Sequence, residues 1–525
     1  MKHFLPKNMR NLGVLALFLF GAIQLQAQDK EVISTIVEKV NHESEEQLQL
    51  LAHELMDQIG PRLVGTPQME ASHHWVVDKY RSWGIDAENQ QWGEWRAWER
   101  GISHIHMVEP RVQSLSGMQL AWSPSTPKKG ITAEVILLPE KIQDSISFAK
   151  WLPNVKGKLV MVSMPEPTGR PDATWEKFAT EKSLEKMQND RNELREAWHK
   201  NISNTGYNSR SLQTALEEAG AAGIVSSYWS KEYGSNKIFG AVTKKIPTVD
   251  ISQEDYGMVY RLAQSGKTPK LHLVAESKGK GTTPTFNTVA RIEGKEKPEE
   301  YVILSAHLDS WDGGTGATDN GTGTITMMEV ARILKEVYPN PKRTIIIGHW
   351  GSEEQGLNGS RAFVEDHPEI METTRVVFNQ DNGTGRVVSI NGQGFLHSYD
   401  FMGRWLRDVP REVSKHIETT YPGMPWGGGS DHASFVAAGV PGFMLSSLNW
   451  EYGKTTWHTN LDTYDKIVFD DLKNNVILIA SLAYLASEDT EEVQRDQVKL
   501  PVNPRTGEQM NWPEQRSPNR KGGMD

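Results

Sequence analysis

The stretch YVILSAHLDSWD, residues 301–312, decides the fold. Its first six residues include no alternation of polar and apolar side chains, which is typical of a strand buried on both faces. His307 and Asp309 follow where this strand ends, and they share one face because strand side chains alternate with a period of two. The stretch therefore predicts an α/β sheet with a functional site at the carboxyl end of a buried strand.

Strands and helices alternate in the sequence around this stretch. The expected order is strand 301–306, helix 322–338, strand 344–348, helix 356–366, strand 375–378, helix 396–409, strand 442–445 and helix 470–487. Upstream, residues 30–58 have helical apolar spacing, and Thr66-Pro67 is typical of a cap followed by proline in the first turn of a helix. We predict an α/β fold, a mixed and mostly parallel sheet with helices on both faces.

Residues 116–284 differ from the rest of the chain. Short β-rich runs such as Leu159–Val162 accompany a long polar helix around Trp175–His199. We predict that 116–284 is an inserted, β-rich domain that divides a main domain into residues 28–115 and 285–490. Residues 491–525 are rich in Pro, Asn, Gly and charge, which predicts an extended C-terminal tail.

The N-terminus is typical of a secretory signal. Lys2, Lys7 and Arg10 precede an uncharged apolar run over residues 12–25, and Ala27 is a suitable cleavage position. The run is short for a membrane span, so we predict a removed signal peptide over residues 1–27, with a retained anchor as the alternative. The mature protein is then secreted or periplasmic and has no membrane span.

Charge and cysteine content exclude several classes of partner and site. The formal net charge is −10, which disfavours nucleic acid as a partner. The chain has no cysteine, so it has no disulfide, and any metal site must use His, Asp and Glu.

Acidic and imidazole side chains follow several of the predicted strands and turns. Glu353-Glu354 comes directly after the apolar strand 344–348, and Asp319 lies in a Gly-rich turn that opens a helix. One acid of such a pair can bind a metal while its neighbour accepts a proton from water. Taken singly, Asp319 is also compatible with a helix cap, and the two glutamates with a solvated pair.

Two further segments, each taken alone, are only weak indications of a functional site. Asp381 follows the strand 375–378, and His458 lies in the stretch WHTNLDTYDKI, residues 457–467. The pairs His73/His74 and His104/His106 are interpreted as structural or surface histidines.

Five segments taken in order resemble a known family. His307-x-Asp309, Asp319, Glu353-Glu354, Asp381 and His458 are similar to the co-catalytic zinc exopeptidases of the aminopeptidase and glutamate carboxypeptidase type. With GGSDHA, residues 428–433, and HTNLDT, residues 458–463, they look most like the plasma glutamate carboxypeptidase branch, also called carboxypeptidase Q. Residues 130–275 resemble the protease-associated domain that many members carry.

The resemblance implies a zinc metallopeptidase with a zinc exopeptidase fold and two ions per chain. One ion would be bound by His307, Asp319 and Asp381, and the other by Asp319, Glu354 and His458. The remaining roles that the resemblance implies are Glu353 as general base, Asp309 as the group that fixes His307, and Asp431 and His432 as pocket residues. The ligand types alone also suit cobalt or manganese.

Several alternatives remain open from the sequence. The resemblance implies a peptide or dipeptide substrate, but aminopeptidase, dipeptidase and carboxypeptidase actions need the same site chemistry. A metal-free, receptor-like binding protein and a single-metal cyclase are the rivals from other classes. The inserted domain next to the site is compatible with a lid or with a homodimer surface.

Overall fold

The computed structural model describes residues 7–523, and it describes side chains from residue 29 onward. The predicted signal peptide, residues 1–27, lies outside the residues whose side chains are described, so it stays a prediction. Among the described residues, no helix combines the length and the apolar character needed to cross a membrane.

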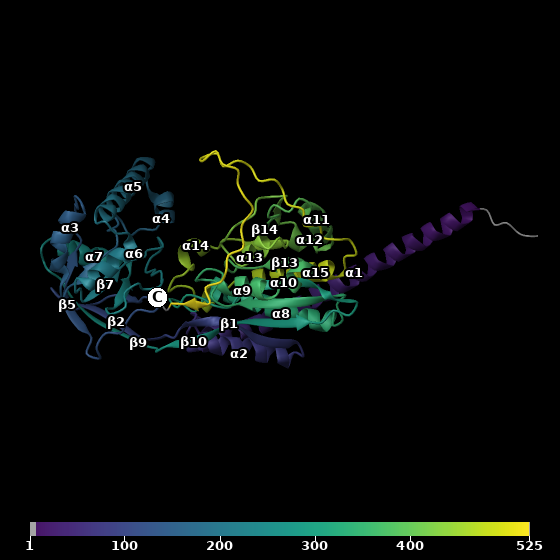
Figure 1. Cartoon of the computed structure of the whole chain (residues 1–525), viewed down its shortest axis with the longest axis horizontal. Coiled ribbons are helices and arrows are strands. Elements are labelled where there is room, and N and C mark those ends of the chain that lie inside the picture. Colours follow the sequence, from purple (N-terminus) through teal and green to yellow (C-terminus); the bar gives the residue numbers. More distant parts are fainter. Residues whose placement is uncertain (1–6, 524–525) are drawn as a thin grey trace, which may run out of the picture.

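A nine-stranded mixed sheet organises the larger part of the described chain (Figure 1). In sheet order its strands are β15 (Glu418–Thr420), β14 (Val387–Asn391), β16 (Gly442–Ser447), β13 (Thr374–Asn379), β11 (Lys297–His307), β12 (Arg343–Trp350), β10 (Thr282–Ile292), β1 (Asp86–Arg96) and β17 (Lys521–Gly522). The four central strands β16, β13, β11 and β12 run parallel to one another. The α/β prediction, a mixed and mostly parallel sheet, is confirmed.

The central strands are apolar because helices cover both of their faces. Val302 and Leu304 of β11 belong to the core on one face, and Ile303 between them belongs to the core on the other. The helices over the first face are α1 (Lys7–Ala52), α2 (Pro67–Ser82), α8 (Thr322–Val337), α11 (Ser398–Asp408) and α15 (Phe469–Glu488). Those over the second are α9 (Asn358–Asp366), α10 (Pro368–Thr373) and α13 (His432–Ala437).

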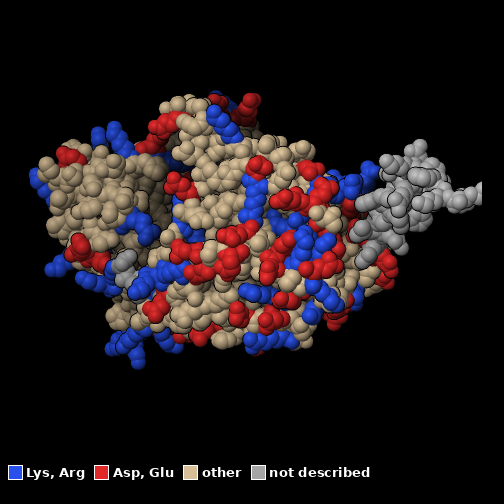
Figure 2. Space-filling model, turned by 45° about the vertical axis from the view of Figure 1, so that its right-hand side comes forward, with Lys and Arg blue, Asp and Glu red and all other residues tan. Residues whose placement is uncertain are grey.

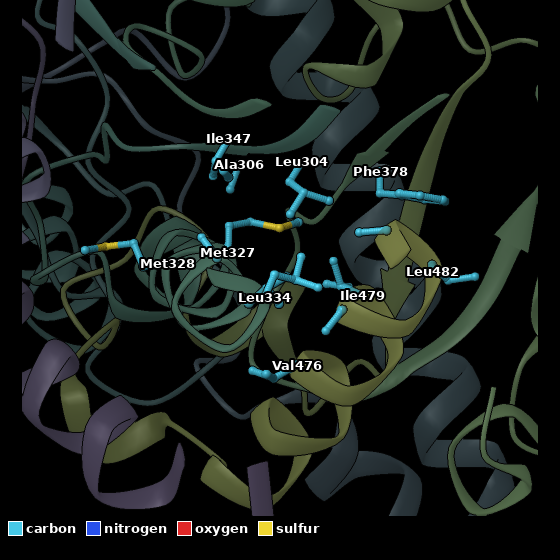
Figure 3. Close-up of a cluster of buried hydrophobic side chains, with 14 of the residues drawn as sticks. Leu304, Ala306, Met327, Met328, Leu334, Ile347, Phe378, Val476, Ile479 and Leu482 are labelled. Atoms are coloured by element: carbon cyan, nitrogen blue, oxygen red, sulfur yellow. The ribbon is translucent and has the colours of Figure 1, made fainter. Parts of the chain in front are cut away.

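The first core joins the sheet to two long helices (Figure 3). Leu304 of β11 lies with Met327 and Leu334 of α8 and with Ile479 of α15, and all four side chains are fully buried. The predicted cap of α2 is also confirmed, because the Thr66 hydroxyl accepts a hydrogen bond from the Met69 amide at 3.2 Å. The cap and this core fix the scaffold on which the strand ends are held.

A second, eight-stranded sheet is inserted in the sequence between β1 and β10. In sheet order its strands are β3 (Gln113–Ser114), β2 (Glu99–Glu109), β9 (Lys270–Lys278), β5 (Ile131–Leu137), β6 (Leu159–Met161), β7 (Gly223–Ser226), β8 (Thr248–Ile251) and β4 (Gly117–Gln119). We propose that the inserted domain runs from β2 to β9, so that it begins at residue 99 instead of 116.

One predicted helix of this part is divided in two. The stretch 175–199 was expected to form one long helix, but the structure has α4 (Asp172–Phe178) and α5 (Glu181–Asn204). Thr180 between them is extended, and its side chain accepts a hydrogen bond from the Ser183 amide, which starts α5 anew. The other helices of this part are α3 (Ser145–Trp151), α6 (Ser209–Glu218) and α7 (Gln253–Gln264).

The C-terminal tail is extended and its described end is attached to the main sheet. β17 pairs in parallel with β1, and Arg520 binds Asp366 at 2.7 Å and Glu365 at 3.0 Å. The described part of the chain thus ends beside β1, near the mark for the C-terminus in Figure 1. Figure 2 shows basic and acidic side chains mixed over one face of the molecule.

Leu304→Ala should lower the free energy of unfolding by about 2–5 kcal/mol, because it opens a cavity in a fully buried core. Denaturant unfolding measures the effect. The matched control is Val112→Ala, where the side chain is 79% exposed, and it should change the free energy by less than about 0.5 kcal/mol. Equal effects of the two substitutions would contradict the assigned core.

Candidate metal centre

Adjacent parallel strands bring the predicted site residues to one edge of the main sheet. His307 is the last residue of β11, Glu353 and Glu354 follow β12, and Asp381 follows β13. Asp319 lies in the turn Ala317–Gly321 that precedes α8. Because the carboxyl ends of parallel strands meet at the same edge, these segments converge although they are far apart in the sequence.

The side chains form two clusters that share Asp319. In the first, His307 Nε2 lies 3.2 Å from Asp381 Oδ1 and 3.5 Å from Asp319 Oδ1. In the second, His458 Nε2 lies 2.8 Å from Glu354 Oε2 and 3.4 Å from Asp319 Oδ2. In each cluster, one ligand atom of every residue lies within 4.8 Å of the others, so each can surround a single ion.

The centre holds more buried negative charge than its own side chains compensate. Burial raises the pKa of Glu354 well above its ordinary value, and the charge of Asp319 raises it further. Burial also raises the pKa of Glu353, opposed by His307 and reinforced by Asp381. Within the described chain, Asp319 Oδ2 and Glu354 Oε1 are buried and have no hydrogen-bond partner. Such atoms suit a cation, and imidazole with carboxylate ligands suits zinc.

The two histidines respond differently to the same surroundings. Burial lowers the pKa of His458 to about 4, so this imidazole is neutral and able to bind a metal at ordinary pH. For His307, burial is outweighed by the charges of Asp381 and Glu353, and its pKa lies well above the ordinary value. A proton on His307 therefore substitutes for missing positive charge, and a cation between the carboxylates would displace it.

Asp309 holds three groups of the centre in place: the imidazole of His307 and the backbone amides of Glu353 and Glu354. Its backbone carbonyl lies 3.0 Å from His307 Nδ1. Its carboxylate accepts hydrogen bonds from the backbone amides of Glu353 at 3.0 Å and Glu354 at 3.2 Å. The sequence pattern assigned its carboxylate to His307, yet the side-chain Oδ1 is 3.5 Å from that imidazole. The carboxylate chiefly holds the backbone of the two glutamates.

Two groups that shape the centre were missed by the sequence reasoning. Asp462 accepts hydrogen bonds from the amide and hydroxyl of Thr318 at 2.7 and 2.8 Å and from the Asp319 amide at 3.1 Å. Arg62 is fully buried and donates to the carbonyls of Leu308, Gly60, Thr315 and Gly316. The signal for Arg62 was its place in GPRLVGTP, residues 60–67, a run with little other charge.

Asp431 and His432, the predicted pocket residues, lie at the start of α13 and are both fully buried. Burial raises the pKa of Asp431 to about 7, and the charge of this residue contributes to the raised pKa of Glu353. Burial lowers the pKa of His432 to about 4. Asp431 thus lies close enough to Glu353 to affect its pKa, and both Asp431 and His432 lie outside the two clusters.

The other singled-out histidines lie outside the two clusters. His73 is buried, and its Nδ1 lies 2.8 Å from the Thr288 hydroxyl. The ring of His106 on β2 pairs with that of His272 at 4.9 Å. Their structural interpretation stands.

The second sheet contributes the neighbours of His458. The Ile238 amide donates to the His458 carbonyl at 2.9 Å, and the Phe239 ring lies edge-on to the imidazole with centroids 5.3 Å apart. Asn236 and Asn460 exchange two further hydrogen bonds, and Arg100 binds Asp312 with two. The inserted part therefore forms one wall of the centre.

Comparisons with known proteins agree with this geometry. Residues 287–483 match Peptidase family M28, and this range contains every residue of the two clusters. Carboxypeptidase Q of Mus musculus is 28% identical over 457 residues, covering 84% of this chain and 86% of that protein. Carboxypeptidase Q of Homo sapiens is 28% identical over 422 residues, covering 79% of each.

Solved structures with a similar fold include two bacterial proteins. The Peptidase M28 precursor of Shewanella amazonensis SB2B has a TM-score of 0.66 at 22% identity, covering 89% of this chain and 99% of that one. A zinc aminopeptidase of Bacillus subtilis has a TM-score of 0.56 at 20% identity, covering 86% of this chain and 97% of that one. Both likenesses concern the fold.

Arg62→Met should lower the free energy of unfolding by about 3 kcal/mol or more, because three buried carbonyls and one partly buried carbonyl lose their donor. Denaturant unfolding measures this loss. Arg411→Ala, at an exposed arginine in α12 (Arg411–Ser414), is the matched control and should be nearly neutral. An Arg62→Met protein as stable as the control would show that the guanidinium does not support these loops.

Proposed function

Because this chain belongs to peptidase family M28, the co-catalytic zinc exopeptidases, we propose that it binds two zinc ions and hydrolyses peptide bonds next to a chain terminus. The observation that carries the proposal is the pair of three-residue clusters joined by Asp319. We further propose that the enzyme acts outside the cytoplasm, after removal of residues 1–27.

The proposed ligands of one ion are His307, Asp319 and Asp381, and those of the other are Asp319, Glu354 and His458. Three protein ligands per ion leave room for water and substrate, as a catalytic rather than a structural site requires. When bound, the two ions supply Lewis-acid chemistry, polarising the scissile carbonyl and making water a stronger acid.

Glu353 is the proposed general base. It adjoins both clusters without belonging to either, and Asp309 fixes its backbone. Burial raises its pKa towards the range in which a carboxylate accepts a proton readily. Its carboxylate takes the proton from the attacking water and then donates it to the departing amine. Asp431 and His432 are proposed to line the substrate pocket beside it.

The rival interpretations are weaker on one specific point. A metal-free, receptor-like protein gains nothing from two clusters in which, within the described chain, Asp319 Oδ2 and Glu354 Oε1 are buried without a hydrogen-bond partner. A single-metal cyclase needs only one of the clusters. Within hydrolysis, aminopeptidase or dipeptidase action and carboxypeptidase action of the plasma glutamate type share this centre. The groups that surround the substrate decide between them.

Glu353→Ala should keep its zinc and lose about 10²–10⁴-fold in kcat, because only the proton acceptor is removed. Asp319→Ala should lose zinc from both positions, since both clusters use this residue. Elemental analysis beside dipeptide hydrolysis measures the two effects. Glu372→Ala, at an exposed glutamate, is the control. A Glu353→Ala enzyme with normal turnover would refute the assigned base.

Export can be tested on the whole chain. Expressed in a bacterium with an outer membrane, the protein should appear outside the cytoplasm with Gln28 as its first residue, as read by N-terminal sequencing. A protein that stays in the membrane fraction with residues 1–27 attached would instead favour the retained anchor.

A further inference from the structure

A second group of parallel strands, in the inserted part, also ends at a pocket. β5, β6, β7 and β8 run parallel to one another, and a pocket of about 520 Å³ lies where β6 and β7 end. It is lined by residues 162–164 after β6, by residues 227–229 after β7, and by α5 and α6 (Figure 1). No residue of the two metal clusters lines it. The carboxyl ends of parallel strands are where α/β sheets bind ligands, and the volume suits a small molecule.

One face of α5 is turned towards this pocket. Arg195, Trp198, His199 and Ile202 line it, and spacings of three and four residues place them on one face of the helix. Ile202 is buried in a hydrophobic cluster with Leu212 of α6, whereas Arg195 and His199 are exposed. The pocket therefore combines an apolar floor with basic side chains at its rim.

The pocket also holds one carboxylate, Glu166, which is not paired with the guanidinium of Arg195. The ion pair of Glu166 is with Arg191, at 3.4 Å, and Arg191 does not line the pocket. In the described part of the chain, Arg195 has no ion pair, and its guanidinium donates to Asn192 Oδ1 at 3.1 Å. The pocket therefore presents a negative and a positive group separately.

Glu166 is buried beyond what its neighbours compensate. Its side chain is 16% exposed, and burial raises its pKa although the charges of Arg191 and Arg195 oppose the shift. The Arg191 guanidinium is shared with Asp172. Within the described chain, Glu166 Oε2 and the Ser227 hydroxyl are buried and have no hydrogen-bond partner. An ammonium group that reaches Glu166 would therefore gain a charged hydrogen bond.

The two strand ends that form the wall are fixed by hydrogen bonds. The Ser227 amide donates to the Ser163 hydroxyl at 2.9 Å, and the Ser163 amide donates to the Tyr256 hydroxyl at 2.9 Å. The buried Asp250 carboxylate accepts the Tyr228 amide at 2.7 Å. A wall that is already ordered loses little entropy when a ligand binds.

These features together fit one class of ligand. A simple anion would be repelled by Glu166 and a simple cation by Arg195, so a zwitterion fits better than either. An α-amino acid carries both charges on neighbouring atoms, and an apolar side chain on it would match the apolar floor and the indole of Trp198.

We propose that this pocket binds a free α-amino acid with an apolar side chain. Its ammonium group lies at Glu166, its carboxylate at Arg195 and His199, and its side chain against Trp198. The site is separate from the metal centre and goes beyond the proposed function, although free amino acids are what an exopeptidase releases.

Calorimetric titration of the zinc-loaded full chain tests the ligand class with L-phenylalanine, L-phenylalaninamide and N-acetyl-L-phenylalanine. L-phenylalanine should bind with a Kd of about 1 mM or lower, and each derivative, which lacks one of the two charges, should bind about 10-fold more weakly. Equal affinities for the three compounds would overturn the proposal. So would a failure of L-phenylalanine, L-leucine and L-methionine to bind.

Crystals soaked in 4-bromo-L-phenylalanine locate the ligand. Diffraction measured on either side of the bromine absorption edge should give an anomalous peak inside the pocket, beside Trp198. The lack of a peak in the pocket, whether or not one appears at the metal centre, would overturn the proposal.

Two variants remove one charge each. Arg195→Ala should weaken the binding of L-phenylalanine about 10-fold and leave that of its amide unchanged, and Glu166→Gln should spare the N-acetyl compound in the same way. Lys200→Ala, at an exposed lysine of α5 that does not line the pocket, is the matched control. Because Arg195 is exposed, its variant should fold even if loss of the Glu166 charge disturbs Arg191. Unchanged binding of L-phenylalanine in Arg195→Ala would overturn the proposal.

Failure of the pocket and failure of the proposed enzyme give different results. Arg195→Ala should leave the kcat/KM for dipeptide hydrolysis unchanged, and a loss of hydrolysis would assign the pocket to the substrate and overturn the separate site. If no peptide is cleaved but L-phenylalanine still binds in an Arg195-dependent way, the proposed function fails and the pocket stands. If peptides are cleaved without such binding, the pocket assignment fails alone.

Discussion

The structure depends on one electrostatic constraint, the burial of several carboxylates at one edge of the main sheet. Burial, together with the charges of neighbouring carboxylates, raises the pKa of Glu353 and of Glu354 well above the ordinary value. Repulsion inside a protein is strong because the surroundings screen it weakly. The buried guanidinium of Arg62 already donates hydrogen bonds to four backbone carbonyls. Bound metal is the compensation that the geometry fits.

The rest of the fold keeps these charges in place. The carboxyl ends of the parallel strands lie at one edge of the main sheet. Hydrophobic cores on both faces of the sheet hold these strands in register. The carboxylates of Asp309 and Asp462 accept hydrogen bonds from backbone amides. They therefore orient the loops of Glu353 and Asp319 and are not among the proposed metal ligands. The loop between β7 and β8 of the inserted part closes one side of the centre next to His458.

The sequence predicted what is encoded locally. The apolar runs 301–306 and 344–348 are strands. The acids and imidazoles that follow such runs lie close together because the carboxyl ends of adjacent parallel strands lie at the same edge of a sheet. Arg62 and Asp462 were missed because their roles come from contacts with residues more than a hundred positions away. The break at Thr180 was missed because charged, helix-favouring residues lie on both sides of it. The helix cap at Thr180 is recognised only from its extended backbone conformation.

The most direct test of this account is diffraction from zinc-loaded crystals at wavelengths on either side of the zinc absorption edge. The account predicts two anomalous peaks about 3.5–4 Å apart, one at His307 and Asp381 and one at Glu354 and His458, with Asp319 between them. A single peak, or peaks that place Glu353 among the ligands, would contradict the assignment of two shared sites and a free base.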